Sequence, residues 1–169
     1  MEERYKSKLI VDLLLHRENE NGKKEILLSL RQNTGHHDGK YDLPGGHVEA
    51  NEDIFEAMIR EAKEEIGIDI QREDLSIIHI YHNFQKNSLK FVFKVSRYKN
   101  EIKNCEENVC KELRWFDINN LPNNIIPGIR IEIENIKNNI LFNSDSIIIG
   151  CDKKWKIQLI KSRVKKSKH

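Results

Sequence analysis

The sequence has few of the residues that would place it in a specialised structural class. Its 169 residues include three cysteines and three prolines, and no apolar run approaches the roughly 20 residues of a membrane helix. Cys105, Cys110 and Cys151 have no zinc-binding spacing and cannot all pair, which argues against a disulfide-stabilised secreted scaffold. The charged start, Met1 to Lys8, is unlike a signal peptide. We therefore expect a cytoplasmic protein without a membrane segment.

The C-terminal end of the chain also lacks acidic residues. Between Lys153 and His169 there are eight basic residues and no acidic one, so residues 1–152 hold 21 basic against 27 acidic residues, a net charge of −6. A body of this sign repels an anionic ligand unless a local cation site attracts it. The length predicts a single domain over residues 1–169, with a basic C-terminal tail from about residue 153.

Apolar periodicity and turn residues predict an α/β layered fold around a mixed sheet. Expected strands are Leu9–Leu15, Ile26–Leu30, Tyr41–Leu43, Leu75–Phe84, Leu89–Val95 and Leu113–Phe116. One helix is expected to open at Asn51 or Glu52 and to stop at Gly67, and a second to follow Pro127 over about Ile129–Leu141. Residues 147–149 and 155–160 suggest a hairpin, with a short terminal helix as the alternative.

One stretch carries an unusual pattern of seven fixed positions. It reads Gly46-x5-Glu52-x7-Arg60-Glu61-x2-Glu64-Glu65-x-Gly67. On a helix, positions 61, 64 and 65 fall within about 100° of arc. Carboxylates this close repel one another unless a cation lies between them. The pattern therefore predicts a divalent metal ion, Mg²⁺ above all, held by Glu61, Glu64 and Glu65.

The neighbouring residues extend this prediction toward phosphate chemistry. Glycine at positions 45 and 46 allows a tight turn and brings main-chain groups near the start of the helix. A metal there could neutralise phosphate oxygens and activate a water molecule. Arg60 is expected to pair through its guanidinium fork with Glu52 or Glu65. The alternative is a solvent-exposed glutamate face without a function. From this chain's own Glu, Arg and Gly frequencies, however, a chance match at all seven positions is on the order of one in a million.

The segment is similar to the signature of the Nudix hydrolases of the MutT type, and it matches at every signature position. The preceding Tyr41-Asp42-Leu43-Pro44-Gly45-Gly46-His47-Val48-Glu49 resembles the strand–loop entry of that family. The strong resemblance covers residues 41–68, and a weaker one runs from the first strand to Leu121-Pro122. It implies an α/β/α sandwich with a mixed β-sheet. It also implies hydrolysis, with Mg²⁺ or Mn²⁺, of a nucleoside diphosphate linked to another group.

Roles for individual residues follow from the same resemblance. Glu61, Glu64 and Glu65 would be metal ligands, and one of them would also be the general base. Gly46 would offer its backbone carbonyl to the metal, while Arg60 and Glu52 would support the geometry. Many family members recruit a further acidic residue from a later loop, for which the candidates are Glu106, Glu107 and Glu112.

Substrate-binding residues are less clearly marked. The resemblance suggests that Arg31, at the end of a strand, meets the substrate's phosphates. His36, in the glycine-flanked loop before the motif, could also contact a phosphate. Tyr81 and Trp115 are candidates for contact with a nucleobase, although an aromatic side chain is more often part of a core.

The leading functional hypothesis is a pyrophosphohydrolase that converts a small nucleoside triphosphate to the monophosphate and pyrophosphate. The alternatives are a nucleotide- or RNA-binding module that uses the basic tail, and an enzyme that removes pyrophosphate from RNA 5′ ends. We expect a small nucleotide or other diphosphate as the partner rather than nucleic acid or a membrane, and a monomer or homodimer.

Overall fold

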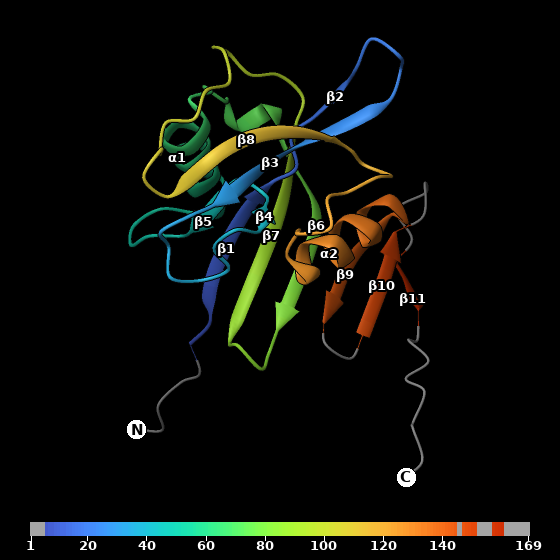
Figure 1. The fold of residues 1–169 in the computed structure, drawn as a ribbon. Helices are drawn as coiled ribbons and strands as arrows, with labels where there is room; N and C mark the ends of the chain where they lie inside the picture. Colours follow the sequence, from blue (N-terminus) through green and yellow to red (C-terminus); the bar gives the residue numbers. More distant parts are fainter. Residues whose placement is uncertain (1–5, 145–146, 152–156, 161–169) are drawn as a thin grey trace.

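The computed structural model describes residues 6–144 together with two short strands at residues 147–151 and 157–160 (Figure 1). The helices are α1 (Ile54–Ile66), α2 (Pro127–Lys137) and a 3₁₀ turn, η1 (Arg72–Asp74). The strands are β1 (Lys8–Leu13), β2 (His16–Glu18), β3 (Lys24–Arg31), β4 (Tyr41–Asp42), β5 (Gly45–His47), β6 (Leu75–Asn83), β7 (Ser88–Val95), β8 (Cys110–Asp117), β9 (Ile140–Ser144), β10 (Ile147–Cys151) and β11 (Ile157–Ile160).

The strands form two sheets, one of which mixes parallel and antiparallel pairs. The larger has the order β11-β10-β9-β6-β7-β1-β5, and in the smaller β3 pairs with β2, β4 and β8. In the larger sheet β1 runs parallel to β7 and antiparallel to β5, whereas the two expected strands β6 and β7 form an antiparallel hairpin. The register of β1 and β5 sets Val11 opposite Gly46 and Asp12 opposite Gly45. This pairing brings the glycine turn onto β1, with β5 as the edge strand of the larger sheet.

The two long helices cover opposite faces of the strands, which confirms the predicted α/β/α sandwich with a mixed sheet. Ala57, Met58 and Ala62 of α1 pack with Val11, Leu13 and Phe93, and Ile129 and Ile133 of α2 pack with Leu14 and Val92. Consecutive residues of β1 and β7 thus face different helices, as period-two alternation requires. In Figure 1, α1 lies at the upper left and α2 at the lower right. From the smaller sheet, Leu27 belongs to the same buried cluster as the core residues of α1, and Leu28 to the cluster of α2.

Helix α1 begins one or two residues later than its sequence pattern suggested. Asp53, rather than Asn51 or Glu52, is the N-cap, and it forms a capping box with Glu56. Glu52 instead accepts a hydrogen bond from the Glu49 backbone N–H. The predicted stop is confirmed, because Gly67 adopts a left-handed conformation with φ of 75°.

The second helix also differs from its predicted bounds. Pro127 is its first residue, where a fixed φ suits a helix start, and the helix ends at Lys137 rather than Leu141. Asn139 has a φ of 55°, which ends the helix and starts β9, a strand that the sequence pattern did not indicate. The hairpin expected near the C-terminus is present as the antiparallel pair β10 and β11. Residues 152–156 and 161–169, most of the basic tail, lie outside the described residues.

No helix in the described part of the chain is both long and apolar enough to cross a membrane.

Candidate active site

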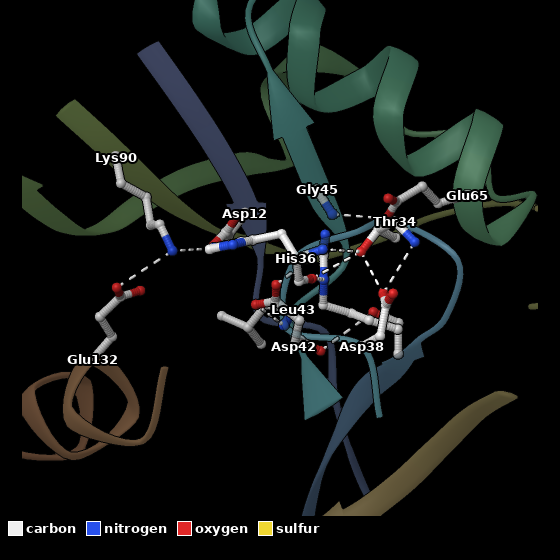
Figure 2. Close-up of polar contacts among 12 residues, drawn as sticks. Asp12, Thr34, His36, Asp38, Asp42, Leu43, Gly45, Glu65, Lys90 and Glu132 are labelled. Carbon is white, nitrogen blue, oxygen red and sulfur yellow. Dashed lines mark hydrogen bonds and ion pairs between the residues drawn. The ribbon is translucent and has the colours of Figure 1, made fainter. Parts of the chain in front are cut away.

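A large cleft opens beside the larger sheet, with a cavity volume of about 1070 Å³. Its walls come from β1, from the loop after β3, from the glycine turn at β5, from α1, and from the start of α2. Figure 2 shows the polar groups that meet there, with Glu65 and Gly45 toward one side and Lys90 and Glu132 toward the other. The cleft therefore joins the glutamate motif of α1 to residues far away in the sequence.

Helix α1 presents its glutamates to a single arginine. The Arg60 guanidinium donates to both carboxylate oxygens of Glu52, at 3.1 and 2.8 Å, as the predicted fork. It also donates to Glu61 and Glu64, each at 2.9 Å, and to the His47 carbonyl oxygen at 3.0 Å. Glu65, the other predicted partner, is not held by Arg60. Arg60 thus fixes the start of α1, its own turn and the end of β5 relative to one another.

Glu65 faces the opposite way, toward the glycine turn. Its Oε2 accepts a hydrogen bond from the Gly45 N–H at 2.7 Å (Figure 2). Gly45 has a φ of 149°, and a Cβ there would lie 2.1 Å from the Val11 carbonyl oxygen. A Cβ on Gly46 would lie 2.3 Å from Glu61 Oε1. Only glycine therefore lets β5 approach both β1 and the carboxylates of α1.

Burial and mutual repulsion act on the two inward-facing glutamates. Burial is the largest cause that raises the pKa of Glu65 to about 8, and the charges of Glu61, Glu106 and Asp12 add to it. Burial also raises the pKa of Glu61, against the opposing effect of Arg60. Glu64 is more exposed, with 51% of its side chain accessible. A hard divalent cation would suit these oxygen donors, since it would offset the repulsion among buried carboxylates.

The carboxylates do not form a compact cluster by themselves. In the described part of the chain, no group of three or more His, Cys, Asp or Glu side chains is arranged to hold a metal ion. The sequence pattern had suggested that Glu61, Glu64 and Glu65 converge, but Arg60 draws Glu64 outward while Glu65 turns inward. Glu61 and Glu65 both line the cleft, and Glu64 is not among its lining residues.

The structure separates the three candidates for an additional acidic residue. Glu106 lines the cleft and its charge acts on both Glu61 and Glu65. Glu112 accepts a hydrogen bond from the Tyr41 hydroxyl instead, and Glu107 is exposed, with its backbone carbonyl bonded to Gln32. Of these three residues, Glu106 alone lines the cleft together with Glu61 and Glu65.

Three of the four predicted substrate residues line the cleft: Arg31, His36 and Tyr81. Arg31 donates to Asp42 Oδ2 at 3.2 Å and to the His36 carbonyl oxygen at 3.1 Å, so its guanidinium is already oriented. Trp115 is placed elsewhere. It packs against the core under α1 and carries the Arg17 guanidinium 4.4 Å from its ring centroid. Trp115 is thus part of the core, as aromatic side chains more often are, and not a contact for a nucleobase in the cleft.

Sequence reasoning missed a group of buried charges on the α2 side of the cleft. Asp12 and Glu132 are each only 4% exposed, and Lys90 Nζ lies 2.8 Å from Asp12 Oδ2 and 3.4 Å from Glu132 Oε1. The sequence does contain a pattern that indicates these buried charges. Asp12 and Lys90 interrupt apolar strands, and Glu132 shares the buried face of α2 with Ile129 and Ile133. A charge at a core position is the informative exception to burial rules.

The cleft as a whole carries more negative than positive side chains. Among its lining residues are the carboxylates of Asp12, Asp42, Glu49, Glu61, Glu65, Glu106 and Glu132, against Lys8, Arg31, Lys86 and Lys90. A polyphosphate entering this cleft would meet repulsion unless cations accompanied it. The electrostatics thus agree with a cation-assisted mode of binding.

Comparison with known proteins places this arrangement in context. The sequence model described as the NUDIX domain matches residues 8–134. The chain is 33% identical over 116 residues to the ADP-ribose pyrophosphatase of Methanocaldococcus jannaschii, which covers 66% of this chain and 63% of that enzyme. It is 33% identical over 78 residues to the 8-oxo-dGTP diphosphatase of Proteus vulgaris, which covers 46% of this chain and 69% of that one. The chain thus spans less than two thirds of the archaeal relative.

Solved structures share the fold at lower identity. A MutT NUDIX hydrolase from Burkholderia pseudomallei superposes with a TM-score of 0.65 at 24% identity, over 76% of this chain and 97% of that one. A NUDIX hydrolase from Nitrosomonas europaea superposes with a TM-score of 0.64 at 21% identity, over 84% of this chain and 79% of the other.

Proposed function

This chain belongs to the NUDIX domain family, and on that premise we propose that it is a metal-dependent pyrophosphohydrolase. The proposed substrate is a small nucleoside triphosphate, which water cleaves to the nucleoside monophosphate and pyrophosphate. More generally, the substrate class is a nucleoside diphosphate linked to another group. The reaction breaks one phosphoanhydride bond and forms one bond between phosphorus and the oxygen of water.

A single arrangement carries this proposal. Glu61, Glu65 and Glu106 all line one cleft, where the charges of Glu61 and Glu106 act on Glu65, and the same cleft holds Arg31 and a glycine turn. Buried carboxylates that repel one another are costly in a folded protein, so their presence in a cleft favours a role in binding cations. Two relatives with 33% identity are named a pyrophosphatase and a diphosphatase, which agrees with this reaction class.

The proposed cofactor is Mg²⁺, with Mn²⁺ as a substitute. Glu61, Glu64 and Glu65 would hold it, with Glu106 and the Gly46 carbonyl oxygen as further donors. When bound, such an ion neutralises phosphate oxygens and makes a water molecule more acidic. One of the glutamates would accept the proton of the attacking water. Arg60 would keep Glu61 in position through the hydrogen bond that it donates to this residue. Glu64, which Arg60 holds outside the cleft in this structure, would have to turn toward the ion.

The remaining residues of the cleft would orient the substrate. Arg31, fixed by Asp42 and by the His36 carbonyl oxygen, would present its outer N–H groups to phosphate oxygens. His36 lies in the same loop, which Asp38 closes by accepting hydrogen bonds from Thr34 and Gly35. Tyr81, on β6, would offer an aromatic surface at the cleft wall.

A substrate screen tests the proposal. Purified protein would be incubated with Mg²⁺ or EDTA and with nucleoside triphosphates, nucleotide sugars, dinucleoside polyphosphates, ADP-ribose and RNA bearing a 5′-triphosphate. Product analysis by ion-exchange chromatography is expected to show metal-dependent release of a monophosphate and pyrophosphate from a triphosphate. Lack of turnover on every diphosphate-containing compound would falsify the proposal, and would leave a nucleotide-binding module as the explanation.

ADP-ribose is the second candidate substrate, because the archaeal relative is named for it. Its cleavage would give AMP and ribose 5-phosphate rather than pyrophosphate, so the same screen separates the two. Turnover of RNA 5′ ends above that of free nucleotides would instead support the RNA alternative. We further propose that the protein acts in the cytoplasm, where its free Cys105 and Cys110 would stay reduced.

A further inference from the structure

The α2 side of the cleft contains charged groups for which the proposed metal site has no use. Glu132 projects from the buried face of α2 toward Lys90, which β7 places beside Asp12 of β1 (Figure 2). Strand register explains this meeting. Lys90 pairs with Ile10 in the parallel β1–β7 ladder, so Lys90 and Asp12 lie on the same face, two residues apart in register.

One oxygen in this group has no protein partner among the described residues. Glu132 is 4% exposed and its Oε1 lies near Lys90, but its Oε2 is buried without a hydrogen bond. The same residue lines the cleft. An unsatisfied buried carboxylate oxygen costs stability, and native proteins retain such groups mainly where they serve function. A ligand that enters the cleft with a hydrogen-bond donor would satisfy this atom.

We propose that Glu132 is a specificity-determining residue that accepts a hydrogen bond from the exocyclic amino group of the substrate's nucleobase. This inference rests on the proposed function, and it deepens that function by naming the part of the nucleotide that the far side of the cleft reads. Lys90 and Asp12 are positioning residues in this arrangement, because Lys90 pairs with Glu132 Oε1 and Asp12 holds Lys90, while Oε2 keeps no hydrogen bond from the protein.

The surroundings suit a base better than a phosphate or a sugar. Ile10, Ile126 and Ile129 line the same cleft and offer apolar surface for a flat ring. A phosphate group there would meet the carboxylates of Asp12 and Glu132, which disfavours it. The metal-binding glutamates lie on the other side of the Asp12–Gly45 contact, where a Gly45 Cβ would come within 3.0 Å of Asp12 Oδ1. The phosphates and the base of the substrate would thus occupy opposite ends of the cleft.

The first test compares substrates that differ in one amino group. ATP with ITP, CTP with UTP, and GTP with ITP form such pairs. In the wild-type protein we expect kcat/KM for the amino-bearing member of at least one pair to be about tenfold higher or more, mainly through KM. In Glu132→Gln the amide oxygen would stay toward Lys90 and the NH₂ would face the cleft. A donor then replaces the acceptor, so the preference should vanish or reverse.

A matched control comes from the same helix. Glu134→Gln alters an exposed carboxylate that pairs with Lys137, and its base preference should equal that of the wild type. The assignment would be overturned if the wild-type protein showed equal preference within each pair. It would also be overturned by an unchanged preference in Glu132→Gln, or by a preference that follows the ribose hydroxyl in ATP against dATP.

A binding measurement separates this inference from the hydrolase proposal. AMP and IMP would be titrated into the wild-type protein, without metal, and followed by calorimetry. Tighter binding of AMP, or of CMP over UMP or GMP over IMP, supports the role of Glu132 even if no substrate is turned over. Equal affinity within every pair contradicts it even if hydrolysis is found. The wild-type comparison also decides the matter if Glu132→Gln does not fold.

Discussion

At the scale of single residues, Glu65 combines three properties that its neighbours share only in part. It is largely buried, it accepts the Gly45 N–H at 2.7 Å, and it is subject to the charges of Glu61 and Glu106. Glu64, one residue before it, is half exposed and bonded to Arg60. Two adjacent positions of one motif therefore have different environments, and the inward one is better placed to act on a substrate.

The first prediction concerns this residue. Replacing Glu65 with Gln should lower kcat on the best substrate by about 10² to 10⁴, the range typical of lost acid–base catalysis, while circular dichroism stays unchanged. Glu73→Gln, in the exposed η1 turn, is the matched control and should keep wild-type rates. A Glu65→Gln rate within threefold of wild type would reject a role for Glu65 in metal binding and catalysis.

A second prediction follows from the pKa of Glu65, which burial raises from its ordinary value of 4.5 to about 8. The folded state then binds this proton more tightly than the unfolded state does. The contribution of Glu65 to the free energy of unfolding is complete below about pH 4.5 and is lost as the pH rises to about 8. The slope is at most about 1.4 kcal/mol per pH unit.

Urea unfolding of EDTA-treated protein between pH 5 and pH 8.5 measures this dependence. Glu65→Gln should remove part of the decline, so the stability difference between variant and wild type should change with pH. Burial likewise raises the pKa of Asp42 to about 6 and that of Glu132 to about 7, but both residues remain in the two proteins compared. A stability difference that is constant across this pH range would contradict the predicted environment of Glu65.

At the scale of elements, the approach of β5 to β1 and α1 depends on two glycines with different neighbours. A Cβ on Gly45 would meet backbone atoms, the Val11 carbonyl oxygen and the Asp12 Cα. A Cβ on Gly46 would meet the end of the Glu61 side chain. Backbone in a paired strand cannot move without disturbing the sheet, whereas a carboxylate can rotate away. Gly45 is therefore required by the packing of the fold, whereas Gly46 is required by the position of the Glu61 side chain in the site.

This contrast gives the third prediction. Gly45→Ala should destabilise the protein by several kcal/mol, seen as a clearly lower midpoint of thermal unfolding, because the strain falls on backbone. Gly46→Ala should unfold at nearly the wild-type temperature but lose at least about tenfold in kcat/KM, since Glu61 would be displaced. Calorimetry and steady-state kinetics on both variants check this. The reverse ranking of the two thermal midpoints would contradict the close approach of β5 to the β1 backbone.

The two ends of α1 show which helix boundaries a local sequence pattern can predict. Gly67 was predicted as the stop of α1 because a left-handed C-cap depends on one residue. The start was misplaced, since Asn51, Glu52 and Asp53 all lie where a polar side chain could open the helix. Glu52 is used instead by Arg60 and by the Glu49 backbone N–H. Tertiary partners therefore decided which of three local options became the cap.

At the scale of the whole molecule, the described cleft is lined by residues between Lys8 and Glu132. The basic C-terminal tail adds charge to a chain whose first 152 residues are net acidic. Because the described lining residues of the cleft all precede this tail in the sequence, we do not expect the tail to contribute to the chemistry of small nucleotides.

The fourth prediction tests whether the tail contributes to nucleotide turnover. Deleting residues 161–169 should leave kcat and KM for a nucleoside triphosphate within about twofold of wild type at about 0.15 M salt. Steady-state kinetics of the shortened and full-length proteins provide the measurement. A large loss of nucleotide turnover would connect the tail to the cleft. A loss of salt-dependent RNA binding with unchanged nucleotide turnover would support the binding-module alternative for the tail alone.

The amino-acid sequence by itself determined the layered α/β fold, the helix with its glutamates, the glycine turn and the family. Each depends on spacing within a short segment, where helix and strand geometry relate neighbouring residues directly. Only the tertiary structure decided that Glu106 rather than Glu107 or Glu112 joins the cleft, and that Trp115 does not. It also brought Asp12, Lys90 and Glu132 together from β1, β7 and α2. Contacts of that kind depend on strand register and helix packing, which no local pattern specifies.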